Sequence, residues 1–210
     1  MSLSPEAEAF AGDWSVSRET CERLDAYVAL LRKWNAHINL VSPRSLDTVW
    51  ARHIADSAQI LSLAVRPKAS WADLGSGGGL PGMVVAIMAM EAASGLGVSL
   101  VESDSRKAAF LAEASRACAV PVEVVCGRIE VARPLSADVV SARALAPLTD
   151  LLEFASRHVA PEGICLFPKG ETVHTEIEAA RSRWRFEPRL HASRTNAGSF
   201  IVEIGDFERV

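Results

Sequence analysis

A glycine-rich segment at residues 71–87, WADLGSGGGLPGMVVAI, carries the pattern that points most directly to chemistry. It holds five glycines within eight residues, between two apolar runs. Glycine allows positive φ angles and leaves room for a ligand beside the backbone, so such a loop usually wraps a nucleotide-like ligand. The alternative is a tight structural turn, in which each glycine would cost up to ~1 kcal/mol of conformational entropy without a ligand to require it.

The order of residues in this segment distinguishes between two classes of cofactor. The dinucleotide fingerprint is G-x-G-x-x-G, but the sixth position counted from Gly75 is Leu80. The spacing is instead D-x-G-x-G-x-G, formed by Asp73, Gly75, Gly77 and Gly79. An acidic Asp73 suits the sulfonium and ammonium groups of S-adenosylmethionine, whereas a pyrophosphate disfavours it. We therefore predict S-adenosylmethionine rather than NAD as the cofactor.

Predicted strands and helices alternate around the glycine-rich segment. Strands are predicted at 70–74, 97–103, 122–127, 137–143 and 163–169, and helices at about 80–93, 104–118, 144–160 and 171–182. This alternation is typical of βαβ units and of a doubly wound, mostly parallel, Rossmann-like α/β sheet. Ligands of such folds bind beyond the carboxyl ends of the strands. Glu102 ends the second strand, 27 residues after Gly75, and is therefore expected to accept hydrogen bonds from ribose hydroxyls.

The two ends of the chain depart from this alternation. Near the C-terminus, RWRFEPRLHAS and SFIVEIGDF are joined by the turn-rich RTNAG without a helix, which predicts an antiparallel hairpin that closes the sheet. Near the N-terminus, apolar residues at helical spacing predict an amphipathic helix within 17–35, and a second helical stretch spans 45–64. We predict an N-terminal helical extension at 1–65 and a Rossmann-like core at 66–210, which begins with a linker, RPKAS.

Composition restricts the class of protein. The chain has 210 residues, no apolar run long enough to cross a bilayer, and an acidic N-terminus without a signal-peptide pattern. We therefore expect a cytoplasmic protein that contacts no membrane. The net charge of −4 argues weakly against a tight nonspecific nucleic-acid binder. The cysteines form no C-x-x-C pair and no zinc-type spacing, so we expect no metal and buried reduced thiols at Cys21, Cys118, Cys126 and Cys165.

Three motifs resemble those of the bacterial RsmG (GidB) family: WNAHINLVSPRS, RHIADS and DLGSGGGLPG, in the family's order and spacing. The later segments SDSRKAAFL, GRIE, SARALAPL and PKG also fit, so the resemblance spans roughly residues 20–205. It implies a methyltransferase that modifies N7 of a guanine in the 530 loop of 16S ribosomal RNA, nucleotide 527. The expected substrate is the small ribosomal subunit or an assembly intermediate, and the expected oligomeric state is a monomer.

The resemblance also implies which residues contact the cofactor. Glu102 replaces the aspartate of the family pattern, but either carboxylate can hold a ribose. Ile129 and Glu130 follow the third predicted strand, where the adenine is expected to lie. For Ile129, simple core packing is the alternative. The implied contacts are Gly75, Leu80, Glu102, Ile129, Glu130 and Arg143, in addition to Asp73, Gly77 and Gly79 from the loop spacing.

The implied reaction requires little from the protein beyond alignment. A methyl group on a sulfonium is already activated, and guanine N7 is a lone pair that carries no proton, so no general base is needed. The sequence agrees with this chemistry in two absences. No cysteine follows a proline, as a C5-pyrimidine enzyme would typically require, and the chain lacks the Pro-Pro of the usual amino-group methylases.

Cations near the strand ends are expected to hold the base and its phosphates. An arginine bound to both O6 and N7 of guanine would block the reacting atom. We therefore expect Arg128, Arg143 and Lys169 to contact O6 and phosphate only, with a solvated charge as the alternative for each. Further candidates are Arg44, Arg52, Arg181, Arg183, Arg185 and Arg189, and for the last four we favour a solvated strand face.

His53 and Asp56 lie three residues apart on the second predicted helix. Because no base is needed, we favour a structural role for them in fixing the NLVS loop over the cofactor, and Asn39 is a candidate for the same loop. The tryptophans Trp34, Trp50 and Trp71 could stack a base, but their amphipathic context favours core packing.

Two other functions are also compatible with the sequence. One is a small-molecule methyltransferase of the same fold, and the other is a binding module without turnover. A basic rim around the cofactor pocket and a methyl acceptor in ribosomal RNA would exclude both.

Overall fold

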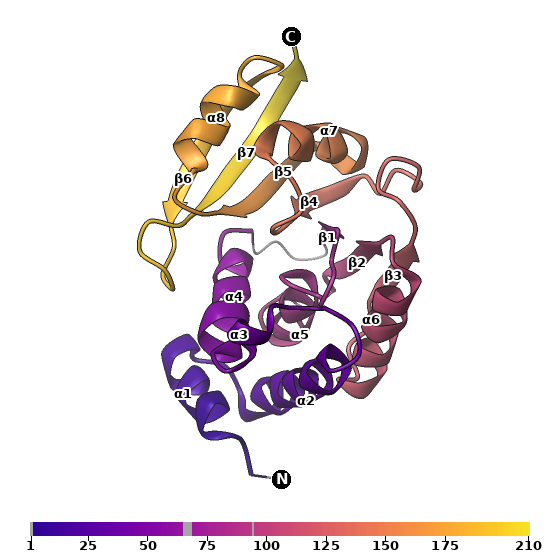
Figure 1. The fold of residues 1–210 in the computed structure, drawn as a ribbon, viewed down its shortest axis with the longest axis vertical. Helices are drawn as coiled ribbons and strands as arrows, with labels where there is room; N and C mark the ends of the chain where they lie inside the picture. Colours follow the sequence, from indigo (N-terminus) through magenta and orange to yellow (C-terminus); the bar gives the residue numbers. More distant parts are fainter. Residues whose placement is uncertain (1, 65–68, 94) are drawn as a thin grey trace.

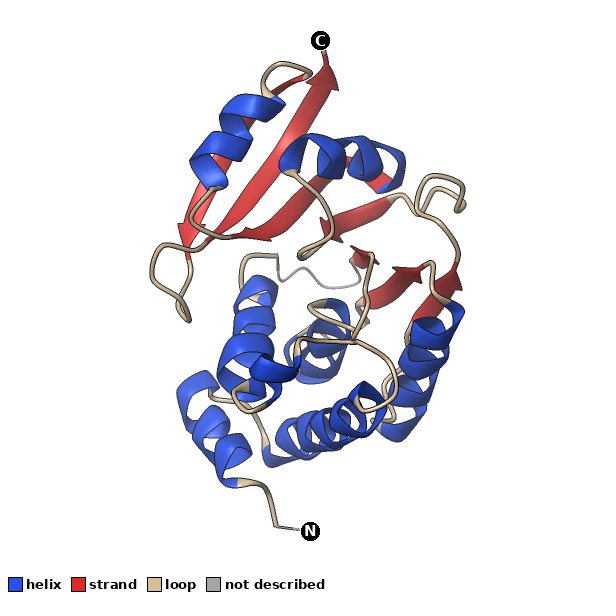
Figure 2. Ribbon diagram, in the orientation of Figure 1, coloured by secondary structure: helices blue, strands red, loops and turns tan. Residues whose placement is uncertain are grey.

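The computed structural model describes residues 2–64, 69–93 and 95–210. The described residues form a seven-stranded sheet in the order β3-β2-β1-β4-β5-β7-β6, with helices on both faces (Figure 1, Figure 2). The strands are β1 Ser70–Leu74, β2 Gly97–Glu102, β3 Glu123–Cys126, β4 Ala137–Ser141, β5 Val159–Lys169, β6 Trp184–Ala192 and β7 Phe200–Arg209. Strands β1 to β5 are parallel, and β7 runs antiparallel to both β5 and β6. The predicted doubly wound α/β fold with a C-terminal hairpin is confirmed.

The order of the strands reverses beside β1, which pairs with β2 on one side and with β4 on the other. This is the topological switch point, where an open α/β sheet leaves a crevice beyond the strand ends. The loop after β1 is the glycine-rich segment, so the sequence places its least sterically hindered backbone at the mouth of that crevice.

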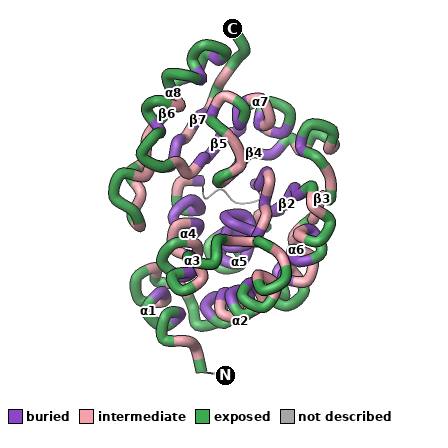
Figure 3. The backbone as a smooth tube through the Cα atoms, in the orientation of Figure 1, coloured by how far each residue is buried: buried purple, intermediate pink, exposed green. Residues whose placement is uncertain are grey.

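The helices cover the two faces unequally. They are α1 Pro5–Trp14, α2 Arg18–Asn35, α3 Pro43–Leu46, the π-helical η1 Trp50–Ala55, α4 Asp56–Leu61, α5 Gly82–Ala92, α6 Ser105–Ala117, α7 Leu148–His158 and α8 Val173–Ala180. One hydrophobic cluster joins α1, α2, η1 and α4 to α5, α6 and the sheet, and a second lies under α7 and α8. Figure 3 shows the buried backbone of α5 and the neighbouring strands in purple. The N-terminal helices therefore pack directly on the helical layer of the sheet.

The N-terminal segment differs from the prediction in two places. Helix α1 is an addition to the predicted elements. Ser4 and Pro5 mark its start: Ser4 Oγ accepts a hydrogen bond from the Ala7 amide at 3.2 Å, and the missing N–H of Pro5 costs nothing at the first helical position. The helical stretch predicted at 45–64 is helical over most of its length, but a turn interrupts it after α3, and η1 then continues directly into α4. Apolar spacing alone does not reveal such breaks. The predicted boundary at 65–66 and most of the predicted linker lie outside the described residues.

Three of the four cysteines are buried, as predicted. The prediction is wrong for Cys126, which is exposed because it ends β3, the edge strand of the sheet. Trp50 and Trp71 are buried, and Trp34 packs edge-on against Phe110, which supports core packing over base stacking. In the part of the chain that the structure describes, no helix is long and apolar enough to cross a membrane.

Candidate functional site

The loop from β1 to α5 depends on glycine for its backbone shape. Gly75, Gly77 and Gly79 have φ angles of +66°, +54° and +83°, which side chains of L-residues rarely allow. A Cβ atom at Gly79 would lie 2.8 Å from Cβ of Met83. At Gly77 the nearest atom to such a Cβ would be the Gly75 carbonyl oxygen at 3.8 Å, so the space beside this residue is open.

The N-terminal helices hold this loop from behind. The Tyr27 hydroxyl, on α2, donates a hydrogen bond to the carbonyl oxygen of Gly78. A Cβ at Gly78 would lie 3.3 Å from Leu40 Cβ, in the segment after α2. That segment is organised by Asn35, whose Oδ1 accepts from the amides of Leu40 and Val41 at 2.9 Å. Asn39, which we expected from the sequence to help fix this loop, is exposed.

Glu102 lies at the end of β2 with its carboxylate directed at backbone amides. Oε2 accepts from the Gly77 amide and Oε1 from the Asp104 amide, each at 2.8 Å. A carboxylate oxygen has two lone pairs, so each oxygen retains capacity for a further hydrogen bond. Glu102 thus fixes the glycine loop and still offers an acceptor at the corner where a ribose is expected.

Asp73 lies beneath the loop rather than on its surface. Its side chain accepts from Ser141 Oγ at 2.7 Å and from the Gly82 amide at 3.2 Å, and the residue is 1% exposed. The Ser141 hydroxyl in turn accepts from Trp71 Nε1 at 2.8 Å. Burial raises the pKa of Asp73 to about 6 despite these hydrogen bonds. Asp73 on β1 is therefore hydrogen-bonded to both β4 and α5. Because its side chain is buried, it can act on a ligand only through the negative charge of its carboxylate.

The turn after β3 carries the residues expected near an adenine. Ile129 is 8% exposed and belongs to the core cluster under α7, which agrees with core packing, the alternative given for this residue. Its carbonyl oxygen lies 2.9 Å from Nε2 of the buried His158. Glu130 is exposed and lies 3.5 Å from Arg128, whose side chain is 75% exposed. Leu80 is buried at the end of the glycine loop.

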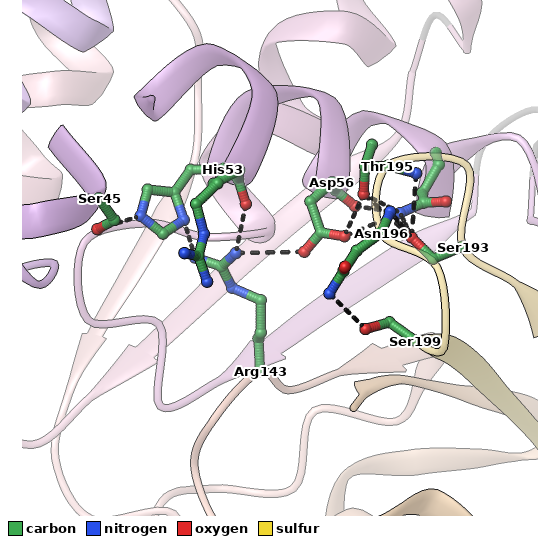
Figure 4. A network of polar contacts seen from close by, with 10 residues as sticks. Ser45, His53, Asp56, Arg143, Ser193, Thr195, Asn196 and Ser199 are labelled. Carbon is green, nitrogen blue, oxygen red and sulfur yellow. Dashed lines mark hydrogen bonds and ion pairs between the residues drawn. The ribbon is translucent and has the colours of Figure 1, made fainter. Parts of the chain in front are cut away.

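Arg143, just after β4, contacts the N-terminal helical segment (Figure 4). Its Nη2 lies 3.1 Å from His53 Nδ1, and its Nη1 lies 3.3 Å from Asp56 Oδ2 and 3.5 Å from the Arg52 carbonyl oxygen. His53 Nε2 lies 2.8 Å from Ser45 Oγ. Burial, followed by the charges of Arg143 and Arg52, lowers the pKa of His53 to about 4. A neutral His53 therefore accepts from Arg143 through Nδ1 and donates to Ser45 through Nε2.

The second oxygen of Asp56 binds the loop between β6 and β7. Asp56 Oδ1 accepts from Thr195 Oγ1 at 3.0 Å and from Gln59 Nε2 at 2.9 Å. Gln59 Oε1 accepts from the Arg194 amide at 2.9 Å, and the Arg194 guanidinium lies 4.3 Å from the centre of the Trp14 ring. Three segments distant in sequence therefore meet at one carboxylate.

A cleft of about 940 Å³ opens between these segments. Its walls come from η1 and α4, from residues 143–147, from the end of β5, from Glu176 on α8 and from residues 193–201. Leu145 lines the cleft, and its side chain covers Gly75, since a Cβ there would lie 2.6 Å from Leu145 Cδ1. Through Leu145 the cleft therefore adjoins the first residue of the glycine loop, beyond the carboxyl ends of β4 and β5.

The three cationic residues expected to contact RNA do not all lie in the cleft. Arg143 and Lys169 line the cleft, whereas Arg128 does not. Lys169 Nζ donates to the Ala146 carbonyl at 2.9 Å and to Glu176 Oε2 at 2.7 Å. Arg52 also lines the cleft, and Arg44 is exposed on α3. The arginines near the C-terminus form ion pairs along the hairpin and nearby helices, in agreement with a solvated face: Arg181, Arg183, Arg185 and Arg189.

Sequence reasoning missed five polar residues that line the cleft, one on α4 and four in the loop between β6 and β7. Gln59 lies within a helical pattern, which gives no sign that its side chain faces a cleft. RTNAG indicated a turn, but not that this turn contacts α4. These residues are Gln59, Ser193, Thr195, Asn196 and Ser199.

Comparisons with known proteins agree with this architecture. The sequence profile of the GidB family, described as rRNA small subunit methyltransferase G, matches residues 20–199. The chain is 50% identical over 190 residues to "Ribosomal RNA small subunit methyltransferase G" of Cereibacter sphaeroides, covering 90% of this chain and 91% of that protein. It is 51% identical over 195 residues to the protein of the same name from a Ruegeria species, covering 93% and 95%.

Solved structures share the fold at low sequence identity. A SAM-dependent methyltransferase from Aquifex aeolicus superposes with a TM-score of 0.59 at 15% identity, covering 85% of this chain and 97% of that one. TYW2 of M. jannaschii in complex with AdoMet superposes with a TM-score of 0.55 at 12% identity, covering 83% and 80%.

Proposed function

Since the chain belongs to the GidB family of small-subunit ribosomal RNA methyltransferases, we propose that it methylates N7 of a guanine in the 530 loop of 16S ribosomal RNA, nucleotide 527. The cleft carries this proposal. Among the described residues that line it, each carboxylate and imidazole is already engaged, because His53 and Asp56 bind Arg143 and Glu176 binds Lys169. Such a site lacks a free general base and suits an acceptor that has no proton to remove.

S-Adenosylmethionine is the methyl donor. The open space beside Gly77 and the free lone pairs of Glu102 fit a ribose and its neighbouring groups. Ile129 packs against the adenine, and Glu130 or the adjacent backbone binds its amino group. The Asp73 carboxylate beneath the loop favours the positive end of the donor. When bound, S-adenosylmethionine supplies a methyl group that its sulfonium has already activated.

The acceptor guanine enters the cleft from an unpaired loop, as base-modifying enzymes require. Arg143 and Lys169 place positive charge near O6 and the phosphates. Arg128, exposed outside the cleft, contacts phosphate farther along the RNA. Because an arginine fork on O6 and N7 would cover the reacting atom, the residues serve alignment rather than proton transfer.

The preferred substrate is the small subunit or an assembly intermediate rather than free RNA. A net charge of −4 gives the chain little nonspecific affinity for RNA. Recognition therefore uses the shape of the particle, and the enzyme acts as a monomer in the cytoplasm, where its substrate is found.

The test uses labelled S-adenosylmethionine with small subunits from cells that lack this protein. Borohydride and aniline cleavage maps N7-methylguanine, and we expect one cleavage, at nucleotide 527. Naked 16S RNA serves as the second substrate and should accept far less label. Incorporation at another base or atom would overturn the assignment. Cofactor binding without incorporation into RNA would favour a small-molecule enzyme or a binding module.

A further inference from the structure

We propose that His53 and Asp56 are positioning residues that act on methyl transfer through Arg143, by holding its guanidinium in one orientation in the cleft. This inference rests on the proposed function, since it assigns these residues a part in presenting the acceptor guanine. It differs from a structural role in fixing the loop before α3, which would act through Ser45 instead.

The contacts of Arg143 leave few of its donors free. A guanidinium has five N–H groups, two on each terminal nitrogen and one on Nε. Nη1 faces two acceptors, Asp56 Oδ2 and the Arg52 carbonyl, and Nη2 faces His53 Nδ1. The donors without a partner among the described residues are therefore Nε–H and one N–H of Nη2.

This arrangement matters for a guanine that reacts at N7. An unrestrained arginine binds guanine most favourably with a fork on O6 and N7. The end-on fork uses one hydrogen of each terminal nitrogen, and both hydrogens of Nη1 are already committed. Asp56 and the Arg52 carbonyl thus remove the end-on fork, and His53 holds one N–H of Nη2. The pair that remains, Nε–H and the other N–H of Nη2, is fixed in direction by these contacts, and it binds O6 or phosphate.

His53 is suited to accept from a cation. Its Nε2–H is directed at Ser45 Oγ, and Ser45 Oγ donates to the Ser42 carbonyl at 2.8 Å. This chain of donors fixes the tautomer and leaves Nδ1 as the acceptor for Arg143 (Figure 4). A protonated ring could not accept, and its charge would repel the guanidinium.

Asp56 extends the arrangement across the cleft. One of its oxygens holds Arg143 and the other holds Thr195 on the loop between β6 and β7. The ion pair with Arg143 is well shielded, since the two side chains are 17% and 21% exposed. The orientation of Arg143 is therefore coupled to the placement of the opposite wall.

Two substitutions at His53 separate this inference from the structural alternative. The carboxamide of asparagine lies near the position of Nδ1, and that of glutamine near the position of Nε2. His53→Asn therefore keeps an acceptor for Arg143 and loses the Ser45 contact, whereas His53→Gln keeps the Ser45 contact and loses the acceptor. His191→Gln, on β6 and outside the cleft, is the matched control for loss of an imidazole.

The assay measures kcat and KM for methylation of subunits, the Kd for S-adenosylmethionine, and thermal stability. We expect His53→Asn to stay within about threefold of the wild type in kcat, and His53→Gln to lose about tenfold to a hundredfold, the cost of a misplaced orienting group. KM, cofactor Kd and stability should change little. A larger loss of kcat in His53→Asn than in His53→Gln would overturn the inference. Equal losses of kcat that parallel a loss of thermal stability would also overturn it. Failure of the proposed function is distinct, because the wild type itself would then give no cleavage at nucleotide 527.

Discussion

The hydroxyl of Tyr27 donates a hydrogen bond to the carbonyl oxygen of Gly78, at the centre of the glycine loop. Burial raises the pKa of Tyr27 far above its ordinary value, so the phenol keeps its proton and remains a donor. The N-terminal helices thus determine the position of the backbone expected to surround the cofactor. Helices that pack on α5 and α6 therefore also hold the loop that we propose for the cofactor.

Tyr27→Phe should therefore weaken cofactor binding as well as stability. It leaves a carbonyl without its donor inside the protein, which costs about 1–3 kcal/mol. We expect the Kd for S-adenosylmethionine, measured by calorimetry, to rise, because the loop loses its anchor. Trp34→Phe is the control, since Trp34 contacts Phe110 in the same cluster. It should lower stability and leave the Kd unchanged. An unaltered Kd in Tyr27→Phe would contradict the prediction.

Asp73 should make the protein less stable as the pH rises. Its pKa is raised by burial from 3.8 to about 6, so the folded state binds the proton more tightly than the unfolded state does. The stability that this group contributes is present below pH 3.8 and is lost as the pH rises through 6. Between pH 4.5 and 7.5 this amounts to about 2 kcal/mol.

Asp73→Asn removes the titration and tests that prediction. Urea unfolding of both proteins should show that the free energy of unfolding of the variant, relative to the wild type, increases by about 2 kcal/mol from pH 4.5 to 7.5. The absolute difference at either pH depends on how asparagine fits against Ser141 and Gly82. A difference that does not change with pH would show that Asp73 has an ordinary pKa.

The sequence predicted local features well and distant contacts poorly. The bounds of β1 follow from a short apolar run that ends at glycine, and Ser70–Leu74 agrees with the prediction residue for residue. The position of Glu102 followed from strand spacing. In contrast, Thr195 lies 139 residues from Asp56, and no local pattern indicates that a turn and a helix start share one carboxylate. The π-helical turn of η1 was also hidden, because apolar spacing continues through it.

The ion pair between Lys169 and Glu176 should matter differently for stability and for activity. Burial alone would raise the pKa of Glu176, but the hydrogen bond and charge of Lys169 hold it below its ordinary value. Lys169→Met leaves the carboxylate partly buried without its cation, which should cost roughly 1–3 kcal/mol. The double variant Lys169→Met with Glu176→Gln should recover most of that stability.

Activity should not recover in the double variant if the ammonium acts on RNA. We expect methylation of subunits to stay low in both variants, while chemical denaturation shows the recovery. Recovered activity would mean that Lys169 serves the fold and has no role at the acceptor.

Cys126 offers a direct probe of the cofactor position. It lies at the exposed end of β3 and is the parallel-register partner of Glu102 on β2, so the two Cα atoms are neighbours across the sheet. The other three cysteines are buried, and burial raises the pKa of Cys118 to about 11, which suppresses the reactive thiolate. A maleimide should therefore label Cys126 first in the folded protein, with Cys126→Ser as the unlabelled control. Because a ribose held by Glu102 would cover this strand end, saturating S-adenosylhomocysteine should slow the labelling. If the nucleoside binds and the labelling rate does not change, the ribose lies elsewhere and Glu102 serves only to hold the glycine loop.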